Sequence, residues 1–289
     1  MSKITLKAWE KYINLLSKIN TKAVDELKEW LNTYGEVVFS EEEYNIYDIL
    51  DGFDNTFIDE CYQVVQKYGN ASAAVAAEMY DAISEMEKAN VPPAEMAELA
   101  SYGDIAKTVN GVLKTSRNAE ELTSAVARWV KKASCDTTLK NAYRDRAQYA
   151  WIPHGDTCAY CMSLAAIGWV NISEKKVRQG YPHAEHIHSN CDCNYAIRHT
   201  KSTYVAGYDD KYYQNKINNA LIKQGIMEEG ENGEDYFRGQ GGWLNDELIN
   251  AVRRENYAQN SKKILEQKAN AYEKRKELNN SKAEETKVN

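Results

Sequence analysis

Residues 71–80 have the sequence ASAAVAAEMY, and this stretch decides what kind of fold the chain can adopt. Alanine has the highest helix propensity of all residues, and half of these ten positions are alanine. Small side chains also let a second helix pack close to the backbone of the first. We therefore predict a helix here whose alanines form a packing face and not a cofactor site.

Helical spacing extends outward from this stretch in both directions. Apolar residues recur every three or four positions over residues 6–34, with a break expected at Asn20-Thr21. Two short helices are predicted on either side of Asp51-Gly52, and Gly69-Asn70 is expected to separate the second of them from the alanine-rich helix. Pro92-Pro93 is expected to end the alanine-rich helix and to start the next one.

Composition excludes several classes of protein. The 289 residues are 43% hydrophobic and 27% charged, and no run approaches 18 uncharged apolar residues, so we expect no membrane contact. A net charge of −7 gives no general attraction for nucleic acid. The amino terminus has no apolar signal core, so we expect the chain to start in a cytosol, where disulfides are rare. Cys61 and Cys135 lie in predicted helices and are expected to be core side chains.

The fold class predicted from these patterns is mainly α: an elongated helical array with a small zinc-knuckle α+β region and a long C-terminal helix. Its expected divisions are a helical domain (1–150), a zinc-knuckle region (151–200), an irregular connector (201–244), and a C-terminal helix with a frayed tail (245–289). Residues 261–289 carry seven lysines and one arginine against five glutamates. This basic end predicts a solvated helix face, and the alternative is a contact with packaged DNA or with an acidic partner.

Cysteine and histidine concentrate in one part of the chain. All five histidines and four of the six cysteines lie between residues 154 and 199. The sequence DTCAYC places Cys158 and Cys161 in a C-x-x-C motif, and HSNCDC supplies His188, Cys191 and Cys193. A C-x-x-C motif with a second Cys/His group can close a tetrahedral zinc site. We predict a structural zinc with these five residues as candidate ligands, one more than the ion needs.

Energetics favour a closed metal site. Bringing together the two ends of the 26-residue loop between Cys161 and His188 costs about 3 kcal/mol. Zinc binding to such ligands supplies roughly 10–16 kcal/mol. Few large aliphatic residues follow Val170, so we expect the metal, and not a hydrophobic core, to hold residues 151–200 together. The alternatives are a redox use of Cys158 and Cys161, a catalytic zinc, or cysteines scattered in loops.

An enzymatic alternative rests on Glu185-His186-Ile187, which after a C-x-x-C motif is similar to zinc-containing HNH-type nucleases. In those folds the histidine is the general base that activates water against a phosphodiester. Only four residues separate His186 from Cys191, too few for the rest of that fold, so a surface histidine is the preferred interpretation. The sequence has no Gly-rich phosphate loop, G-x-S-x-G or H-E-x-x-H motif, and we predict no catalytic residue and no small-molecule substrate.

Three motifs resemble one known family. The sequence YGNASAAVAAEMYD over 68–81 is similar to a Y-G-x-A-A-A-x-A-A-E-x-Y-D segment of tailed-phage minor head proteins related to the Mu F-like head morphogenesis family. Residues 152–168 resemble its V-P-x-G-x-T-C-x-F-C-x-M-L-A-S-x-G signature, with Tyr160 in place of phenylalanine and Ala166-Ile167 as a second departure. Residues 188–193 resemble its terminal H-x-N-C-x-C.

This resemblance implies a structural protein of the phage head, assembled in the bacterial host cytoplasm, present in the virion and docked on the portal protein or the major capsid protein. The family's metal ligands correspond here to Cys158, Cys161, His188 and either Cys191 or Cys193. Some relatives are maturation proteases or carry toxin domains, but this sequence offers no motif for either activity. Aromatic residues suit partner contacts, and Tyr160, Trp169 and Tyr181 are the expected anchors.

Overall fold

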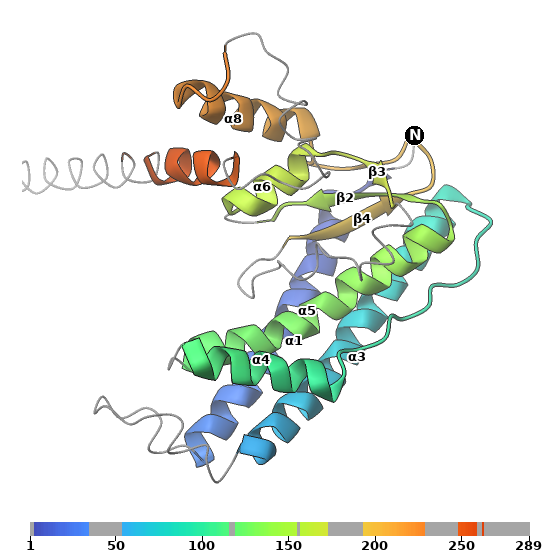
Figure 1. The fold of residues 1–289 in the computed structure, drawn as a ribbon. Helices are drawn as coiled ribbons and strands as arrows, with labels where there is room; N and C mark the ends of the chain where they lie inside the picture. Colours follow the sequence, from blue (N-terminus) through green and yellow to red (C-terminus); the bar gives the residue numbers. More distant parts are fainter. Residues whose placement is uncertain are drawn as a thin grey trace, which may run out of the picture. The chain divides into compact units, whose positions relative to one another are not determined.

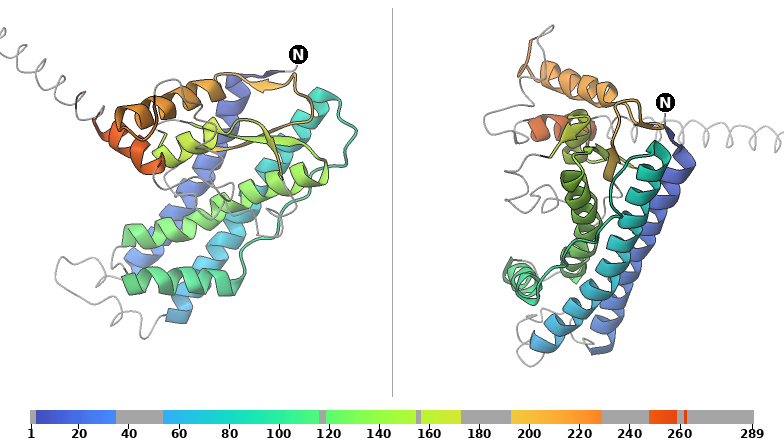
Figure 2. Two further views of the ribbon diagram at one scale, coloured as in Figure 1. Left: turned by 45° about the horizontal axis from the view of Figure 1, so that its top comes forward. Right: turned by 90° about the vertical axis from the view of Figure 1, so that its right-hand side faces the viewer.

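The computed structural model describes residues 3–34, 54–115, 119–154, 157–172, 193–228, 248–258 and 262. These residues are mainly helical with a few short strands (Figures 1 and 2), which confirms the predicted fold class at that level. The chain divides into two compact units. The first unit comprises Met1–Thr157 with Ile167–Asp209, and the second comprises Cys158–Ala166 with Asp210–Asn289. The elongated shape and the predicted divisions of the chain stay predictions.

Helix α1 (Leu6–Tyr34) is continuous, so the break predicted at Asn20-Thr21 is wrong. Thr5 caps the helix, because its hydroxyl accepts the Ala8 N–H at 3.2 Å. The buried positions on both sides of the expected break share one face, so a bend would pull one half off the core. They are Trp9, Tyr12, Ile13 and Leu16 before it, and Ala23, Leu27 and Leu31 after it. Asn and Thr cost a helix well under about 1 kcal/mol each, which this burial outweighs.

Helix α3 (Asp54–Glu87) also runs without interruption through Gly69-Asn70, where a boundary was predicted. A Cβ on Gly69 would lie 3.2 Å from Leu99 Cδ2 and 3.8 Å from Ala133 Cβ, so glycine gives room here for neighbouring segments. The alanine-rich packing face is confirmed, since Ala73 and Ala76 are buried. This face packs against α5 (Ala119–Arg144), and α1 packs on both helices (Figure 2).

The segment between α3 and α4 (Tyr102–Thr115) is extended, so Pro92-Pro93 does not start a helix. Side chains of α5 hold this segment by its backbone. Asn141 accepts the Glu95 N–H at 2.9 Å and donates to the Glu95 carbonyl at 2.8 Å. Arg144 donates to the carbonyls of Pro92 and Pro93. These bonds could not be predicted from the sequence, because each joins residues 46 to 52 positions apart.

The main hydrophobic core of the first unit lies among α1, α3, α4 and α5. Each helix contributes fully buried side chains, including Leu27, Phe57, Ile105, Leu122 and Val126. Trp30 packs on Phe57 at the edge of this core, with ring centroids 5.1 Å apart. The four helices therefore form one packed body from segments far apart in the sequence.

Two small sheets complete the first unit. In the larger one, β2 (Gln148–Ile152) lies between β3 (Val170–Asn171) and β4 (Asn194–Arg198), with both pairings antiparallel. β1 (Lys3–Ile4) pairs in parallel with β5 (Tyr204–Val205). Four of the five residues of both β2 and β4 are buried, so this part of the chain does bury apolar surface.

The second unit has its own hydrophobic core. It joins α6 (Ala159–Ala166), α8 (Asp210–Lys223) and the helical residues 248–258 through buried side chains such as Ala159, Met162, Ile217, Leu221, Leu248 and Val252. Residues 151–200 were expected to have little chance of a core of their own, and α6 and β4 bury their apolar side chains against segments outside that range. The cause is long-range: the partners of α6 come from residues beyond 210.

Two further predictions concern the C-terminal third. The connector predicted as irregular contains α8 over 210–223, whose buried Ile217, Ala220 and Leu221 were too few for its periodicity to stand out in the sequence. Within the predicted C-terminal helix, residues 248–258 are helical. The remainder of that helix, except residue 262, lies outside the described residues, so its predicted length finds no support.

Candidate functional site

The C-x-x-C motif lies at the start of α6. The Cys158 carbonyl accepts the Met162 N–H at 3.0 Å, and the Cys158 sulfur accepts the Cys161 N–H at 3.4 Å. Cys158 thus occupies the N-cap position, with its sulfur where a capping oxygen would lie. Cysteines three positions apart at a helix start share one face. This arrangement fits half of a tetrahedral thiolate site, and the helix N-terminus favours the charged thiolate.

The other candidate ligands are placed differently. Cys193 belongs to the first unit, immediately before β4, where its sulfur accepts the His154 N–H at 3.4 Å. His188 and Cys191 lie outside the described residues, as does His186 of the nuclease alternative. Within the part of the chain that the structure describes, no group of three or more His, Cys, Asp and Glu side chains could hold a metal ion. The zinc site therefore stays a prediction.

The two other cysteines are confirmed as core side chains. Cys61 on α3 and Cys135 on α5 are both fully buried. Burial raises the pKa of Cys135 to about 12, so the thiol stays protonated at neutral pH. Its sulfur lies 3.5 Å from Asn194 Oδ1, to which it donates. Neither thiol has the low pKa of a reactive or metal-binding cysteine.

The expected aromatic anchors are less exposed than their loop positions suggested. Tyr160 is half-buried against the core of the second unit, and burial raises its pKa above the ordinary value. Trp169 is also half-buried, with the Arg198 guanidinium 4.6 Å from its ring centroid and Tyr208 packed edge-on. Tyr181 lies outside the described residues. Tyr160 and Trp169 thus serve internal packing.

His199 lies against α3, in a polar cluster that sequence position alone did not predict. Its Nε2 is 2.9 Å from the Ser84 hydroxyl, and its ring packs edge-on against Tyr80. The backbone N–H groups of His199 and Thr200 both donate to Glu87 Oε2. More than a hundred residues separate His199 from its α3 partners, so no spacing rule could bring them together.

The charges around His199 are held in place by α3 and the end of α5. The Tyr80 hydroxyl donates to Asp145 Oδ2 at 2.8 Å, and the Arg144 guanidinium binds both oxygens of the same carboxylate. Burial alone would raise the pKa of Asp145, but the hydrogen bonds from Arg144 and Tyr80 hold it below its ordinary value. Asp145 is therefore a charged acceptor at neutral pH.

A serine beside a histidine invites comparison with a nucleophile and its base, but the hydrogen bonds oppose that role. The Ser84 hydroxyl donates to the Tyr80 carbonyl at 3.0 Å within α3. Since the single hydroxyl proton is used there, the His199 ring nitrogen acts as the donor to Ser84. A general base must instead accept that proton. The pair therefore fastens the end of β4 to α3.

This contact makes stability depend on pH. Burial lowers the pKa of His199 below 6.5, so the unfolded chain takes up a proton before the folded one does. We expect the contribution of His199 to be fully present above about pH 6.5 and to be lost as pH falls through the lower folded pKa. The free energy of unfolding, measured in urea between about pH 8 and about pH 5, should decline less steeply for His199→Gln than for wild type. Parallel curves would exclude this role.

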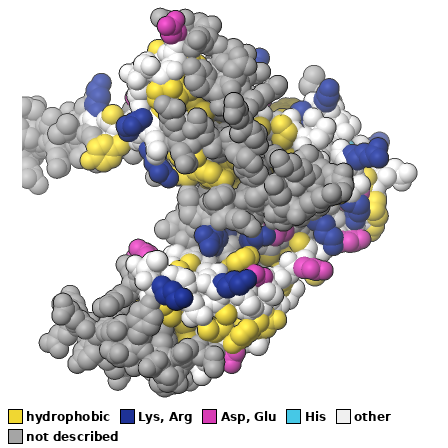
Figure 3. All heavy atoms as spheres, in the orientation of Figure 1, with side chains coloured by type: hydrophobic (Ala, Val, Ile, Leu, Met, Phe, Trp, Pro, Cys, Tyr) yellow, Lys and Arg dark blue, Asp and Glu magenta, His cyan; other side chains and the backbone are white. Residues whose placement is uncertain are grey.

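The surface of the described residues does not point to one class of partner. On the face shown in Figure 3, basic and acidic side chains are interspersed over the described residues. None of the described helices contains an apolar stretch long enough to cross a bilayer. Large exposed aromatic residues do occur in the second unit, where Tyr212 is 51% and Tyr257 is 77% exposed. The sequence did not single these residues out.

Comparisons with known proteins point to one family. A family model described as VG15 protein matches residues 3–220, which cover the first unit and most of α8. No curated protein and no solved structure matches the chain. Since the match covers about three quarters of the 289 residues, the chain belongs to the VG15 protein family, a family of phage proteins.

Proposed function

We propose that this phage protein is a structural minor head component that docks on the portal protein or the major capsid protein during head assembly and stays in the virion. The observation that carries the proposal is the family match over residues 3–220. The three motifs that resemble minor head proteins, at 68–81, 152–168 and 188–193, lie inside this matched range. The role requires binding surfaces and a stable frame, and no catalysis.

The structure supports a frame of this kind. Three long helices share one core, and the extended segment before α4 is fixed to α5 through its backbone. Backbone hydrogen bonds of this type hold a segment in one conformation whatever its exposed side chains are. Such a scaffold keeps a docking surface in the same shape in every copy. The Ser84 and His199 pair acts as a structural contact, which agrees with a non-enzymatic role.

A structural zinc belongs to the proposal. Cys158 and Cys161 would supply two ligands at the start of α6, and His188 with Cys191 or Cys193 would complete the tetrahedron. The basic residues after 260 would lie near packaged DNA in the head interior.

Among the described residues, the second unit offers the best surface for docking a partner. Tyr212 and Tyr257 are among its most exposed side chains, and the Lys216 ammonium lies 4.9 Å from the Tyr212 ring centroid. Exposed tyrosines beside basic groups are typical of protein interfaces, in which a few aromatic residues supply most of the binding energy. We therefore place the portal or capsid contact on this unit.

Co-expression with the portal protein and the major capsid protein of the same phage tests the proposal. We expect the protein to co-purify with one of them and to be found by mass spectrometry in mature particles. The double variant Tyr212→Ser and Tyr257→Ser should bind its partner about 30-fold more weakly and co-purify with correspondingly less of it. Two interface tyrosines contribute about 2 kcal/mol together to the free energy of binding. Tyr204→Ser, an exposed tyrosine on β5 in the first unit, is the matched control and should bind normally.

Two outcomes would contradict the proposal. Absence from mature particles together with no binding to either partner would exclude a head component. Cleavage of plasmid DNA in magnesium or manganese that is lost in His186→Ala would replace it with the nuclease alternative.

A further inference from the structure

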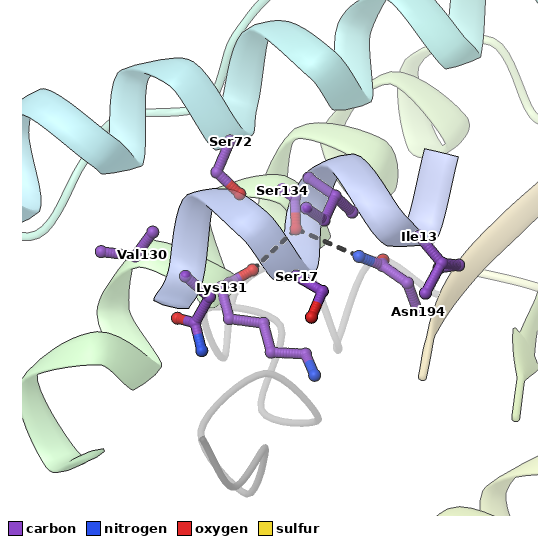
Figure 4. A pocket seen from close by; sticks show the side chains of 9 residues that line it. Ile13, Ser17, Ser72, Val130, Lys131, Ser134 and Asn194 are labelled. Atoms are coloured by element: carbon purple, nitrogen blue, oxygen red, sulfur yellow. Dashed lines mark hydrogen bonds between the residues drawn. The ribbon is translucent and has the colours of Figure 1, made fainter. Parts of the chain in front are cut away.

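A small pocket lies inside the first unit, among α1, α3, α5 and the start of β4 (Figure 4). Its lining is rich in hydrogen-bonding groups: Ser17, Asn20, Ser72, Lys131, Ser134 and Asn194. Three apolar side chains complete the lining, and no carboxylate contributes to it. The pocket therefore offers one positive group and hydroxyl donors, with the buried Asn20 carbonyl oxygen as an acceptor and no carboxylate.

Lys131 gives the pocket its charge. The residue is only 9% exposed, although it carries a long charged side chain. Among the described residues, its ammonium has no ion-pair or hydrogen-bond partner. The neighbouring lysines of α5 do have partners, since Lys132 pairs with Asp136 and Lys140 with Glu95. The Lys131 ammonium is not among the fully buried polar atoms, so solvent reaches it, and an anion in the pocket would supply the counter-charge that it lacks among the described residues.

Serine hydroxyls surround the same space. Figure 4 shows Ser17, Ser72 and Ser134 with their oxygens toward the pocket, one each from α1, α3 and α5. Within the described part of the chain, the hydroxyls of Ser17 and Ser72 have no hydrogen-bond partner, so each has a proton to donate. Together with the Lys131 ammonium, which has three protons, these hydroxyls place hydrogen-bond donors on three sides of the pocket.

Asn194 and Ser134 fix one wall of the pocket. The Asn194 amide donates to the Ser134 hydroxyl at 3.1 Å, and Ser134 donates to the Lys131 carbonyl at 2.8 Å. The Asn194 carbonyl oxygen in turn accepts the Tyr195 N–H at 2.7 Å. These bonds hold the helix turn that carries Lys131 in place before any ligand arrives, which lowers the cost of binding.

We propose that this pocket binds a small oxyanion, phosphate or sulfate. The enclosed space admits about one or two water-sized groups, so one or two oxygens of the anion would lie between Lys131, Ser17 and Ser72. The rest of the ion would face the open side. Charge-assisted hydrogen bonds of this kind bind tetrahedral oxyanions well, and apolar walls strengthen them by excluding water. The site does not depend on the proposed head function.

Thermal unfolding of the full-length chain tests the proposal. Potassium phosphate should raise the wild-type Tm in a saturable way, by about 5 °C at a hundredfold excess over Kd, compared with potassium chloride of equal ionic strength. Lys131→Met should lose the shift, and Ser72→Ala should weaken binding about tenfold. Lys140→Met is the matched control, because Lys140 lies on the same helix outside the pocket and should keep the full shift.

Direct binding keeps the test independent of folding defects. Isothermal titration with phosphate should give one site per chain in wild type and none in Lys131→Met, while Lys131→Arg restores binding because it keeps the charge. A Tm shift equal in phosphate and chloride would overturn the proposal. So would full phosphate binding by a folded Lys131→Met variant, since the ion would then bind elsewhere on the surface.

Discussion

Replacing Cys161 by serine is expected to remove zinc from the protein. Wild-type protein purified under reducing conditions should contain about one zinc per chain, and the variant close to none. One of four ligands supplies about a quarter of roughly 10–16 kcal/mol, so losing it weakens binding by about 70- to 900-fold. Cys161 is buried near the start of α6. Elemental analysis by mass spectrometry gives the stoichiometry.

The control for this change is another buried cysteine. Cys61→Ala removes a thiol from the main core of the first unit and should leave the zinc content unchanged. Single Cys191→Ser and Cys193→Ser variants identify the fourth ligand, because only the true ligand should lower occupancy. Far-UV circular dichroism should change little in Cys161→Ser, since α6 packs in a core of its own. Zinc-free wild-type protein would remove the metal from the proposed function.

Leu27→Ala is expected to destabilise the first unit by about 3 kcal/mol. Leu27 is fully buried and belongs to the core that joins α1 to α3, α4 and α5. Truncating a buried leucine loses its transfer free energy and leaves a cavity that the helices only partly close. We expect the Tm to fall by about 6–12 °C. Urea unfolding gives the same loss as a lower midpoint with an unchanged slope.

Lys28→Ala is the matched control for the core change. Lys28 is the next residue along α1 and is exposed, so its replacement should alter stability by less than about 0.5 kcal/mol. If Leu27→Ala also costs less than about 1 kcal/mol, α1 is not packed on the core as described. The two variants together separate the effect of burial from any effect of helix propensity, because both create alanine.

The candidate metal site shows how far local reasoning reaches. Spacing alone identified Cys158 and Cys161 as a pair, and the structure places them together because three-residue spacing at a helix start puts both on one face. The same reasoning grouped His199 with the cysteines, whereas the fold places it beside Ser84 on α3. Proximity in sequence predicts proximity in space within a helical turn, and no further.

The sequence by itself determined that the long helices α1, α3 and α5 form and which of their faces are buried, because propensity and periodicity act over a few residues. Leu27, Ala73 and Cys61 could all be assigned to a core on that basis. Tertiary structure alone decided that α1 and α3 continue through Asn20-Thr21 and Gly69-Asn70, and that Lys131 faces a pocket of serines. The physical reason is one of scale: a break signal is worth about 1 kcal/mol or less, and burial against distant segments outweighs it.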